Sequence, residues 1–407
     1  MRALDKNKVL SLVGVVTLGL LGGCSSGSDS GSVAVQGDVA IAYVKRPVAT
    51  LGNPTDAITF APGGDLYMRE RSSPSAPETC ITCAETQGAG DVSDPEVSYD
   101  GTKILFTMRK SGDPGWRVRE YDLTTRQIRT IACDAAAPGD DVDPAYLPDG
   151  RIVFASNRQE KSRQQMATAG ETPFAYLDEY ERERVTALHV MNNDGSNCRQ
   201  ISFNQSHDRN PTVLRTGEVM YSRWDHVGGR NQFSIFFTNP DGTNLFVLYG
   251  AHSPGNSFLH PREMPDGRVI SSLMPLSRTN EGGALMAIDV RNYSENCEPA
   301  DNSLPACGGQ TQTTQQLINF GMGISEFGRF STPYPLWDGT NRALVTWTPS
   351  CAAVNIANCP TEINPLTGLP EPEESTPVYG VYMLDLTTKA MRPVVTAPAG
   401  YAVLDAV

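Results

Sequence analysis

The stretch Asp141–Arg158 reads Asp-Val-Asp-Pro-Ala-Tyr-Leu-Pro-Asp-Gly-Arg-Ile-Val-Phe-Ala-Ser-Asn-Arg and predicts two strands joined by a tight turn. Pro144 fits an extended entry, because proline fixes φ and donates no hydrogen bond to a sheet. Asp149-Gly150 is a pair that accepts the positive φ of a hairpin turn. The β-branched and aromatic run Ile152-Val153-Phe154 then suits a buried strand.

This unit recurs along the chain, each time as a proline followed five and six residues later by a turn pair. The pair is Asp-Gly after Pro95, Pro144, Pro261 and Pro333, and Thr216-Gly217 after Pro211. A third strand follows in each unit, and a fourth is visible in most of them. Tandem units of four strands predict the blades of a β-propeller, which stack because no blade can bury both of its faces alone.

The two ends of the chain complete the ring. Ile41–Lys45 reads as the second strand of a blade and Asp65–Met68 as the third, with no innermost strand ahead of them. Tyr401–Val407 is a strand with no blade after it. We therefore predict an all-β fold, a β-propeller of six four-stranded blades that is closed by pairing of the N- and C-terminal strands.

Three insertions interrupt the repeat pattern, namely Gln159–Arg184, Asn296–Gly328 and Cys351–Pro377. The insertion Gln159–Arg184 contains a charged stretch, Tyr176–Arg184, that predicts a solvated surface helix. The polar segment Gln310–Gln316 and the proline-rich segment Pro370–Glu374 read as exposed loops.

The start of the chain has a different character. A basic head precedes the apolar run Val9–Leu21, which is short for a bilayer span, so residues 1–23 predict a secretory signal. Leu21-Gly22-Gly23-Cys24 resembles a bacterial lipobox, and this resemblance implies that Cys24 becomes lipidated. The alternative is an ordinary signal peptide followed by an incidental cysteine.

The rest of the chain divides into a tether and a body. Residues 24–38 are rich in Ser and Gly and predict a flexible tether, and residues 39–407 predict a single propeller domain. Ser25, by resemblance to lipoprotein sorting rules, favours an exported protein anchored by its lipid in the outer membrane and facing the periplasm. The net charge is −13, and removal of residues 1–23 leaves −15, which argues against a nucleic-acid partner.

Eight cysteines follow Cys24, and an even number in an exported protein indicates disulfides. The spacing favours Cys297 with Cys307 and Cys351 with Cys359, because each pair closes a loop within an insertion. The other four are Cys80, Cys83, Cys133 and Cys198. They can pair in three ways, and the sequence does not choose among them.

The repeated units resemble the Asp-Pro and Pro-Asp-Gly repeats of TolB-like propellers. Longer stretches are similar to the propeller of proteins related to the hydrazine synthase alpha subunit, namely Phe60–Tyr67, Asp94–Gly101, Tyr146–Phe154 and Tyr221–His226. The resemblance spans residues 39–407 and implies a periplasm-facing protein with relatives that carry c-type haem. No Cys-x-x-Cys-His occurs in this sequence. We therefore predict no haem and no other cofactor, and leave a bound metal ion as an alternative.

Four of the five histidines of the chain fall between residues 207 and 260. Segments that enter the innermost strands of a propeller line one mouth of its channel, so these histidines and nearby charged residues predict a funnel that binds a ligand or metal. The predicted funnel consists of His207, Asp208, Arg209, Arg223, Asp225, His226, His260 and Arg262. The alternative is structural and is the favoured one, since the Asp before Pro recurs as Asp94 and Asp143 and a repeated residue indicates a repeated structural role.

The sequence contains no nucleophile elbow, zinc-protease helix, phosphate loop or dinucleotide fingerprint. We therefore predict a binding or scaffold module for a protein or small-molecule partner, with the channel mouth and the inserted loops as its contact surface, rather than an enzyme. The alternative, implied by the resemblance, is a cofactor-dependent redox or lyase enzyme or the propeller subunit of one.

Overall fold

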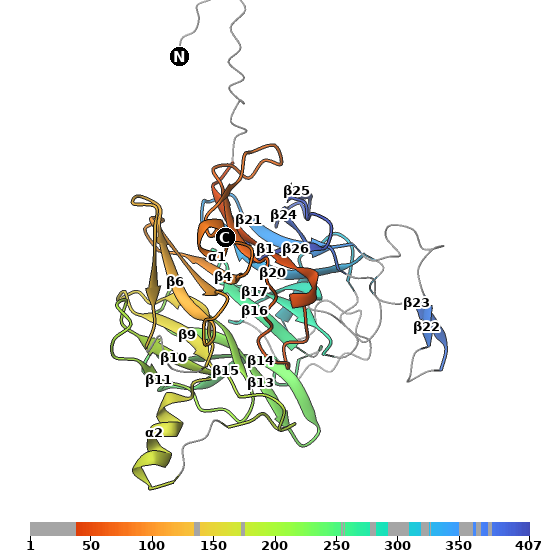
Figure 1. Ribbon diagram of the computed structural model, residues 1–407. Helices are drawn as coiled ribbons and strands as arrows, with labels where there is room; N and C mark the ends of the chain where they lie inside the picture. Colours follow the sequence, from red (N-terminus) through yellow and green to blue (C-terminus); the bar gives the residue numbers. More distant parts are fainter. Residues whose placement is uncertain are drawn as a thin grey trace, which may run out of the picture. The chain divides into compact units, whose positions relative to one another are not determined.

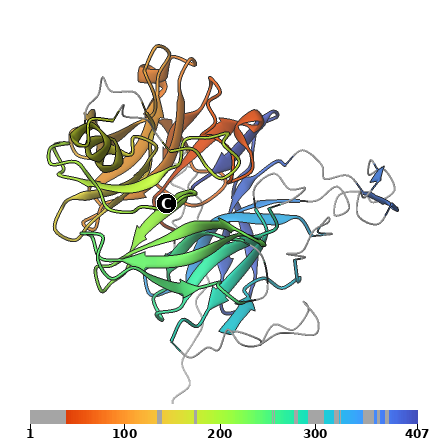
Figure 2. The ribbon, with the colours of Figure 1, turned by 90° about the horizontal axis from the view of Figure 1, so that it is seen from below.

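The computed structural model describes residues 38–133, 139–171, 176–253, 255, 257–276, 282–291, 309–318, 325, 327–349, 361–363, 368–372 and 377–407. The predicted signal, the tether, Cys24 and the predicted pairs Cys297–Cys307 and Cys351–Cys359 lie outside these residues. The described strands form six four-stranded sheets and one two-stranded sheet. Figure 2 shows the large sheets arranged around a common axis, so the predicted six-bladed propeller is confirmed.

The four positions within the blades, from the axis outward, are filled as follows. The innermost strands are β4 (Asp91–Val97), β8 (Asp141–Tyr146), β12 (Asp208–Val213), β16 (Ser257–Glu263), β20 (Arg329–Pro335) and β26 (Tyr401–Leu404). The second strands are β5 (Lys103–Arg109), β9 (Ile152–Ser156), β13 (Val219–Val227), β17 (Val269–Met274), β21 (Arg342–Thr348) and β1 (Ile41–Pro47). The third strands are β6 (Arg117–Asp122), β10 (Ala187–Met191), β14 (Arg230–Thr238), β18 (Ala284–Ile288), β24 (Gly380–Asp385) and β2 (Asp65–Arg69). The outer strands are β7 (Gln127–Ile131), β11 (Arg199–Gln200), β15 (Phe246–Tyr249), β19 (Gln310–Gln312), β25 (Met391–Val395) and β3 (Thr79–Cys80).

The blade that joins the two ends of the chain has the strand order β26-β1-β2-β3. β26 pairs antiparallel with β1, and Leu404 lies opposite Val44. Beyond the last strand residue, Ala42 and Val407 exchange two backbone hydrogen bonds of 2.9 Å. The predicted closure by the N- and C-terminal strands is therefore confirmed, and the C-terminus lies near the centre of the ring (Figure 2).

The hydrophobic core lies between neighbouring blades. Every residue of β9 and β17 is buried, as expected for a strand that is covered on both faces by adjacent sheets. The hairpin of the quoted stretch forms as predicted, with the N–H of Gly150 donating to the carbonyl of Leu147 at 2.9 Å and Gly150 at a φ of +86°. The Asp-Gly pair thus supplies the left-handed residue of the turn.

The predicted helix over Tyr176–Arg184 is wrong. The described helices are η1 (Val48–Thr50), α1 (Cys83–Thr86) and α2 (Glu160–Thr168), and α2 is near the start of the same insertion (Figure 1). In the predicted stretch, the carboxylate of Asp178 accepts the backbone N–H groups of Arg182 and Glu183 at 2.8 and 3.3 Å. Such local side-chain bonds stabilise turns at the expense of a helix. Among the helices described, none is long and apolar enough to cross a membrane.

The two predicted loops also contain strands. Gln310–Gln312 is the outer strand β19, which pairs antiparallel with β18. The amide of Gln312 can be buried there because it binds both the N–H and the carbonyl of Ile318, at 2.7 and 3.0 Å. β23 (Pro370–Pro372) pairs with β22 (Thr361–Ile363) as the separate two-stranded sheet. Both stretches are therefore strands and not loops at these residues; Gln310 and Gln312 are buried, whereas Thr311 and Pro370 are exposed as predicted.

Candidate functional site

The residue before each repeat proline lies at a β-bulge on the innermost strand. The pairing register shifts at Asp94-Pro95, Asp143-Pro144, Asn210-Pro211, His260-Pro261 and Thr332-Pro333. These five residues have φ between +24° and +56°, and Asp405, with a φ of +50°, holds the matching place after β26. Asp, Asn and His tolerate this left-handed conformation better than most residues, which explains why they recur here. We call Asp94, Asp143, Asn210, His260, Thr332 and Asp405 the axial ring.

Hydrogen bonds link the axial ring from blade to blade. The side chain of one member accepts the backbone N–H of the next, so neighbouring blades are joined close to the axis. The donor and acceptor pairs are Asp143 to Asp94 at 3.2 Å, Asn210 to Asp143 at 3.0 Å, His260 to Asn210 at 3.3 Å and Asp405 to Thr332 at 3.3 Å. The predicted structural role of the Asp before Pro is thus visible in detail.

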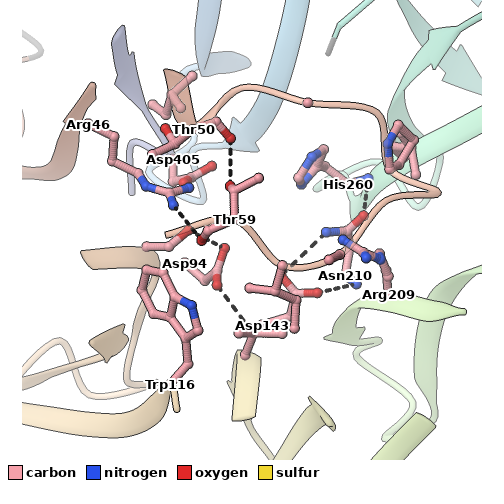
Figure 3. Close-up of a pocket in the computed structure, with 18 of the residues that line it drawn as sticks. Arg46, Thr50, Thr59, Asp94, Trp116, Asp143, Arg209, Asn210, His260 and Asp405 are labelled. Carbon is pink, nitrogen blue, oxygen red and sulfur yellow. Dashed lines mark hydrogen bonds between the residues drawn. The ribbon is translucent and has the colours of Figure 1, made fainter. Parts of the chain in front are cut away.

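A cavity that is partly open to solvent lies against the axial ring (Figure 3), and the space within it is about 820 Å³ when the adjoining open solvent is included. Five axial-ring residues line it, all except Thr332, together with Arg46, Trp116 and Arg209. Its other side is formed by residues 48–61, the segment between β1 and β2, which we call the cap loop. All six members of the axial ring line a smaller adjoining space along the axis.

The cap loop is anchored to blades on several sides of the ring. Arg209 donates through Nη2 to the carbonyl of Asp56 at 2.6 Å, and Asn53 donates to the carbonyl of Leu276. The ring of Phe60 meets Trp116 edge-on at 6.4 Å between centroids. The loop therefore closes over one mouth of the channel. Sequence reasoning missed it, although apolar Ile58 and Phe60 within a loop were a usable signal.

Two of the arginines beside the axis are neutralised by ion pairs. Arg46 makes a bidentate contact with the buried carboxylate of Asp91 at 2.8 and 2.9 Å. Arg262 donates through Nη1 to Glu96 at 2.5 Å. Their charges are therefore compensated within the protein.

The protonation of the axial ring is altered by its surroundings. Burial, together with the negative charge of Asp94, raises the pKa of Asp143 to about 7. Burial also lowers the pKa of His260 to about 4, so its imidazole is neutral near pH 7. The cavity thus presents carboxyl groups, one of which titrates near neutral pH, beside a neutral histidine.

The residues of the predicted funnel lie at separate places in the structure. Arg209 and His260 line the cavity, and Arg262 lines the adjoining axial space. Asp208 and Arg223 instead form a buried bidentate pair between β12 and β13, at 2.8 and 3.0 Å. The same pairing joins Asp141, the first residue of β8, to Arg158 at 2.6 and 2.8 Å. The repetition indicates a structural role for Asp208 and Arg223.

His207 and His226 belong to an aromatic stack around Trp224. The ring centroids of His207 and His226 lie 5.5 and 5.1 Å from that of Trp224, and Tyr180 lies 4.3 Å from His226. Burial lowers the pKa of His207 well below its ordinary value, and the Nδ1 of His226 is 3.1 Å from Glu179. Asp225, on the same strand β13, has a pKa raised by burial.

Among the described residues, one group of three or more His, Cys, Asp or Glu side chains brings its ligand atoms within 4.8 Å of one another, namely Asp65, Cys80 and Cys83. Cys80 and Cys83 form a disulfide, so their sulfurs are not available as thiolate ligands. Cys133 and Cys198 form the second described disulfide, which settles the pairing that the sequence left open. The predicted funnel residues are not gathered into a compact ligand set of this kind within the described part of the chain.

The fold defines the chain as a six-bladed β-propeller. It is similar to a chain of hydrazine synthase from Kuenenia stuttgartiensis, with 15% sequence identity and a TM-score of 0.63 over 91% of this chain and 46% of that one. A putative TolB from Agrobacterium tumefaciens matches at 11% identity and a TM-score of 0.46, covering 88% of each chain. The predicted resemblance to the hydrazine synthase propeller is confirmed at the level of the fold. No family model and no curated protein matches the chain.

Proposed function

We propose that the chain is an exported, lipid-anchored propeller that acts as a binding module, with the capped axial cavity as its ligand site. The lipobox-like Leu21-Gly22-Gly23-Cys24 and the Ser- and Gly-rich tether support attachment to the outer membrane on its periplasmic side. The cavity favours a small molecule over a protein as the partner that binds there.

The observation that carries this proposal is the convergence of five of the six blades on one cavity. Each of these five blades contributes a polar side chain of the axial ring, and the cap loop adds a wall from the opposite side. Concave sites in which a few polar groups converge are the usual places for small ligands. The cap loop restricts access to the cavity from one mouth of the channel. A small molecule can be enclosed in such a cavity, whereas a protein partner would need an open surface.

The test uses the purified mature chain and a library of small polar molecules, screened by ligand-induced thermal stabilisation. Ala57 is an exposed residue of the cap loop that lines the cavity, so Ala57→Trp should fill the entrance. Ala84→Trp, at an exposed position on α1, is the matched control. We expect at least one compound to stabilise the wild type and the control but not Ala57→Trp. Equal stabilisation of both variants, or none by any compound, would contradict the proposal.

A second candidate is the propeller part of a cofactor-dependent redox or lyase enzyme. The similarity of fold to hydrazine synthase over 91% of this chain favours it, although this chain spans 46% of the protein that it matches. Such a role needs a cofactor or a cofactor-bearing partner. Visible absorption, or a transition metal in stoichiometric amount in natively purified protein, would favour the enzyme over the binding module.

A further inference from the structure

The charges that face the axial cavity do not balance. Three guanidinium groups lie at the axis, those of Arg46, Arg209 and Arg262. Five carboxyl groups lie among them, namely Asp91 and Glu96, which pair with Arg46 and Arg262, and Asp94, Asp143 and Asp405. An excess of carboxylates in a partly enclosed space attracts a cation.

The hydrogen bonds of the two central carboxyl groups come from neutral donors. Asp94 accepts the hydroxyls of Ser93 and Thr107, at 2.8 and 3.0 Å, and the N–H of Asp143. Asp143 accepts the backbone N–H of Asn210 at 3.0 Å. These bonds orient the carboxyl groups, and a cationic donor would add a charge-assisted hydrogen bond to them.

An independent observation lies beside these carboxyl groups. The side chain of Trp116 is 1% exposed and lines the cavity, and its Nε1–H has no hydrogen-bond partner among the described residues. Figure 3 shows the indole directed into the cavity on the side of Asp94. Buried indole N–H groups usually find an acceptor. A ligand that offers an acceptor at this position would satisfy it.

We propose that the axial cavity binds a small organic cation in which a protonated amine faces Asp94 and Asp143, and a neighbouring oxygen accepts the Nε1–H of Trp116. This inference rests on the proposed function and specifies the chemical class of its ligand. A primary amine that carries a hydroxyl group on the next carbon but one, as in ethanolamine, has this pair of groups.

Binding of such a cation should depend on pH through Asp143. The charged or titratable groups around it are Asp94 of β4, Arg209 of β12, His260 and Arg262 of β16, Arg46 of β1, and Asp405 after β26. Burial and the negative charge of Asp94 raise the pKa of Asp143 to about 7, and a bound amine favours the ionised form. Affinity should therefore rise about tenfold between pH 6 and pH 8, with release of a proton on binding near pH 7.

The test compares matched probes on the full mature chain by titration calorimetry and ligand-observed NMR. Ethanolamine, ethylene glycol and glycolate share one size and differ in charge, and propylamine keeps the amine but lacks the oxygen. We expect ethanolamine to bind most tightly, propylamine about fivefold more weakly, and ethylene glycol and glycolate more weakly still.

Two variants test the contact with the amine and the contact with the oxygen separately. Asp143→Asn keeps an oxygen that can accept the N–H of Asn210 and should weaken ethanolamine binding about tenfold or more while removing its pH dependence. Trp116→Phe should bring ethanolamine to the affinity of propylamine. The matched controls are Asp266→Asn, in an exposed turn, and Trp337→Phe, at an exposed position. They should change neither the affinity for ethanolamine nor its pH dependence.

The outcomes distinguish this inference from the proposed function. Tighter binding of glycolate than of ethanolamine, or amine binding that Asp143→Asn leaves unchanged, would overturn the inference and leave the cavity as a ligand site. Failure of all four probes would overturn the inference too, and the library screen with Ala57→Trp would then decide the proposed function by itself.

Discussion

Replacing Leu404 with Ala should weaken the closure of the ring. Leu404 lies on β26, is 2% exposed and packs in one apolar cluster with Val44 of β1, Leu66 of β2 and Val92 of the next blade. The substitution removes apolar contacts from both sides of the closing blade and leaves a cavity. It should therefore lower the stability of the whole propeller and not only that of its last strand.

The magnitude follows from burial. A buried Leu→Ala change costs about 2 to 5 kcal/mol, which is a large part of the roughly 5 to 15 kcal/mol by which domains are stable. Deletion of residues 401–407 also removes the buried side chains of Val403 and Val407, each contributing about 1.5 to 3 kcal/mol, together with the pairing to β1. The deletion should therefore sharply lower the melting temperature or abolish a cooperative transition.

The assay is equilibrium unfolding in urea, followed by circular dichroism and by tryptophan fluorescence. Leu317→Ala, at a site that is 55% exposed, is the matched control and should change the free energy of unfolding by less than about 0.5 kcal/mol. If Leu404→Ala cost no more than this control, or if the truncated protein melted as the full chain does, the reasoning on closure would be refuted.

Three further predictions follow from other parts of the molecule. Changing both Cys133 and Cys198 to Ser removes a cross-link between residues 65 apart and should cost about 4 kcal/mol in the urea assay by the chain-entropy model; a loss below about 1 kcal/mol would contradict it. Because the pKa of Asp143 is raised from 3.8 to about 7, its protonated form adds stability that is complete below about pH 4 and is lost as the pH rises to about 7. Asp143→Asn should flatten this part of a plot of stability against pH, and an unchanged slope would count against the assignment. Cys24→Ser should move the protein from the membrane fraction to the soluble fraction of cells, as followed by immunoblotting, whereas a protein that stays with the membrane would argue against lipid anchoring.

The fold was predictable because its signals are local and repeated. Asp149-Gly150 and its counterparts fix turns by their backbone preferences, and the apolar runs after them mark strands that are buried on both faces. The outer strand Gln310–Gln312 was not predictable in this way, because it forms by pairing with β18 and its buried Gln312 is satisfied by Ile318, six residues away in sequence. The periodicity of apolar residues along the sequence does not predict such a contact.

The site was predicted in part. The sequence pointed to the entry of the innermost strands and to His260 and Arg209, which do line the cavity. It could not show that Asp208 faces Arg223 across two strands, nor that a loop after β1 covers the channel, because these contacts join distant parts of the chain. The recurrence of Asp, Asn or His before proline was a usable signal for left-handed residues at the axis.

The blade-to-blade hydrogen bonds of the axial ring allow the charge of the cavity to change while the contacts between blades are kept. The bond requires only a side-chain oxygen, which the carboxylate of Asp94, the amide of Asn210 and the hydroxyl of Thr332 all supply. An exchange between Asp and Asn at one of these positions changes the charge of the cavity by one unit and retains an oxygen for the joint between blades. Related propellers could therefore diverge in ligand preference through single substitutions at the axis, at little cost in stability.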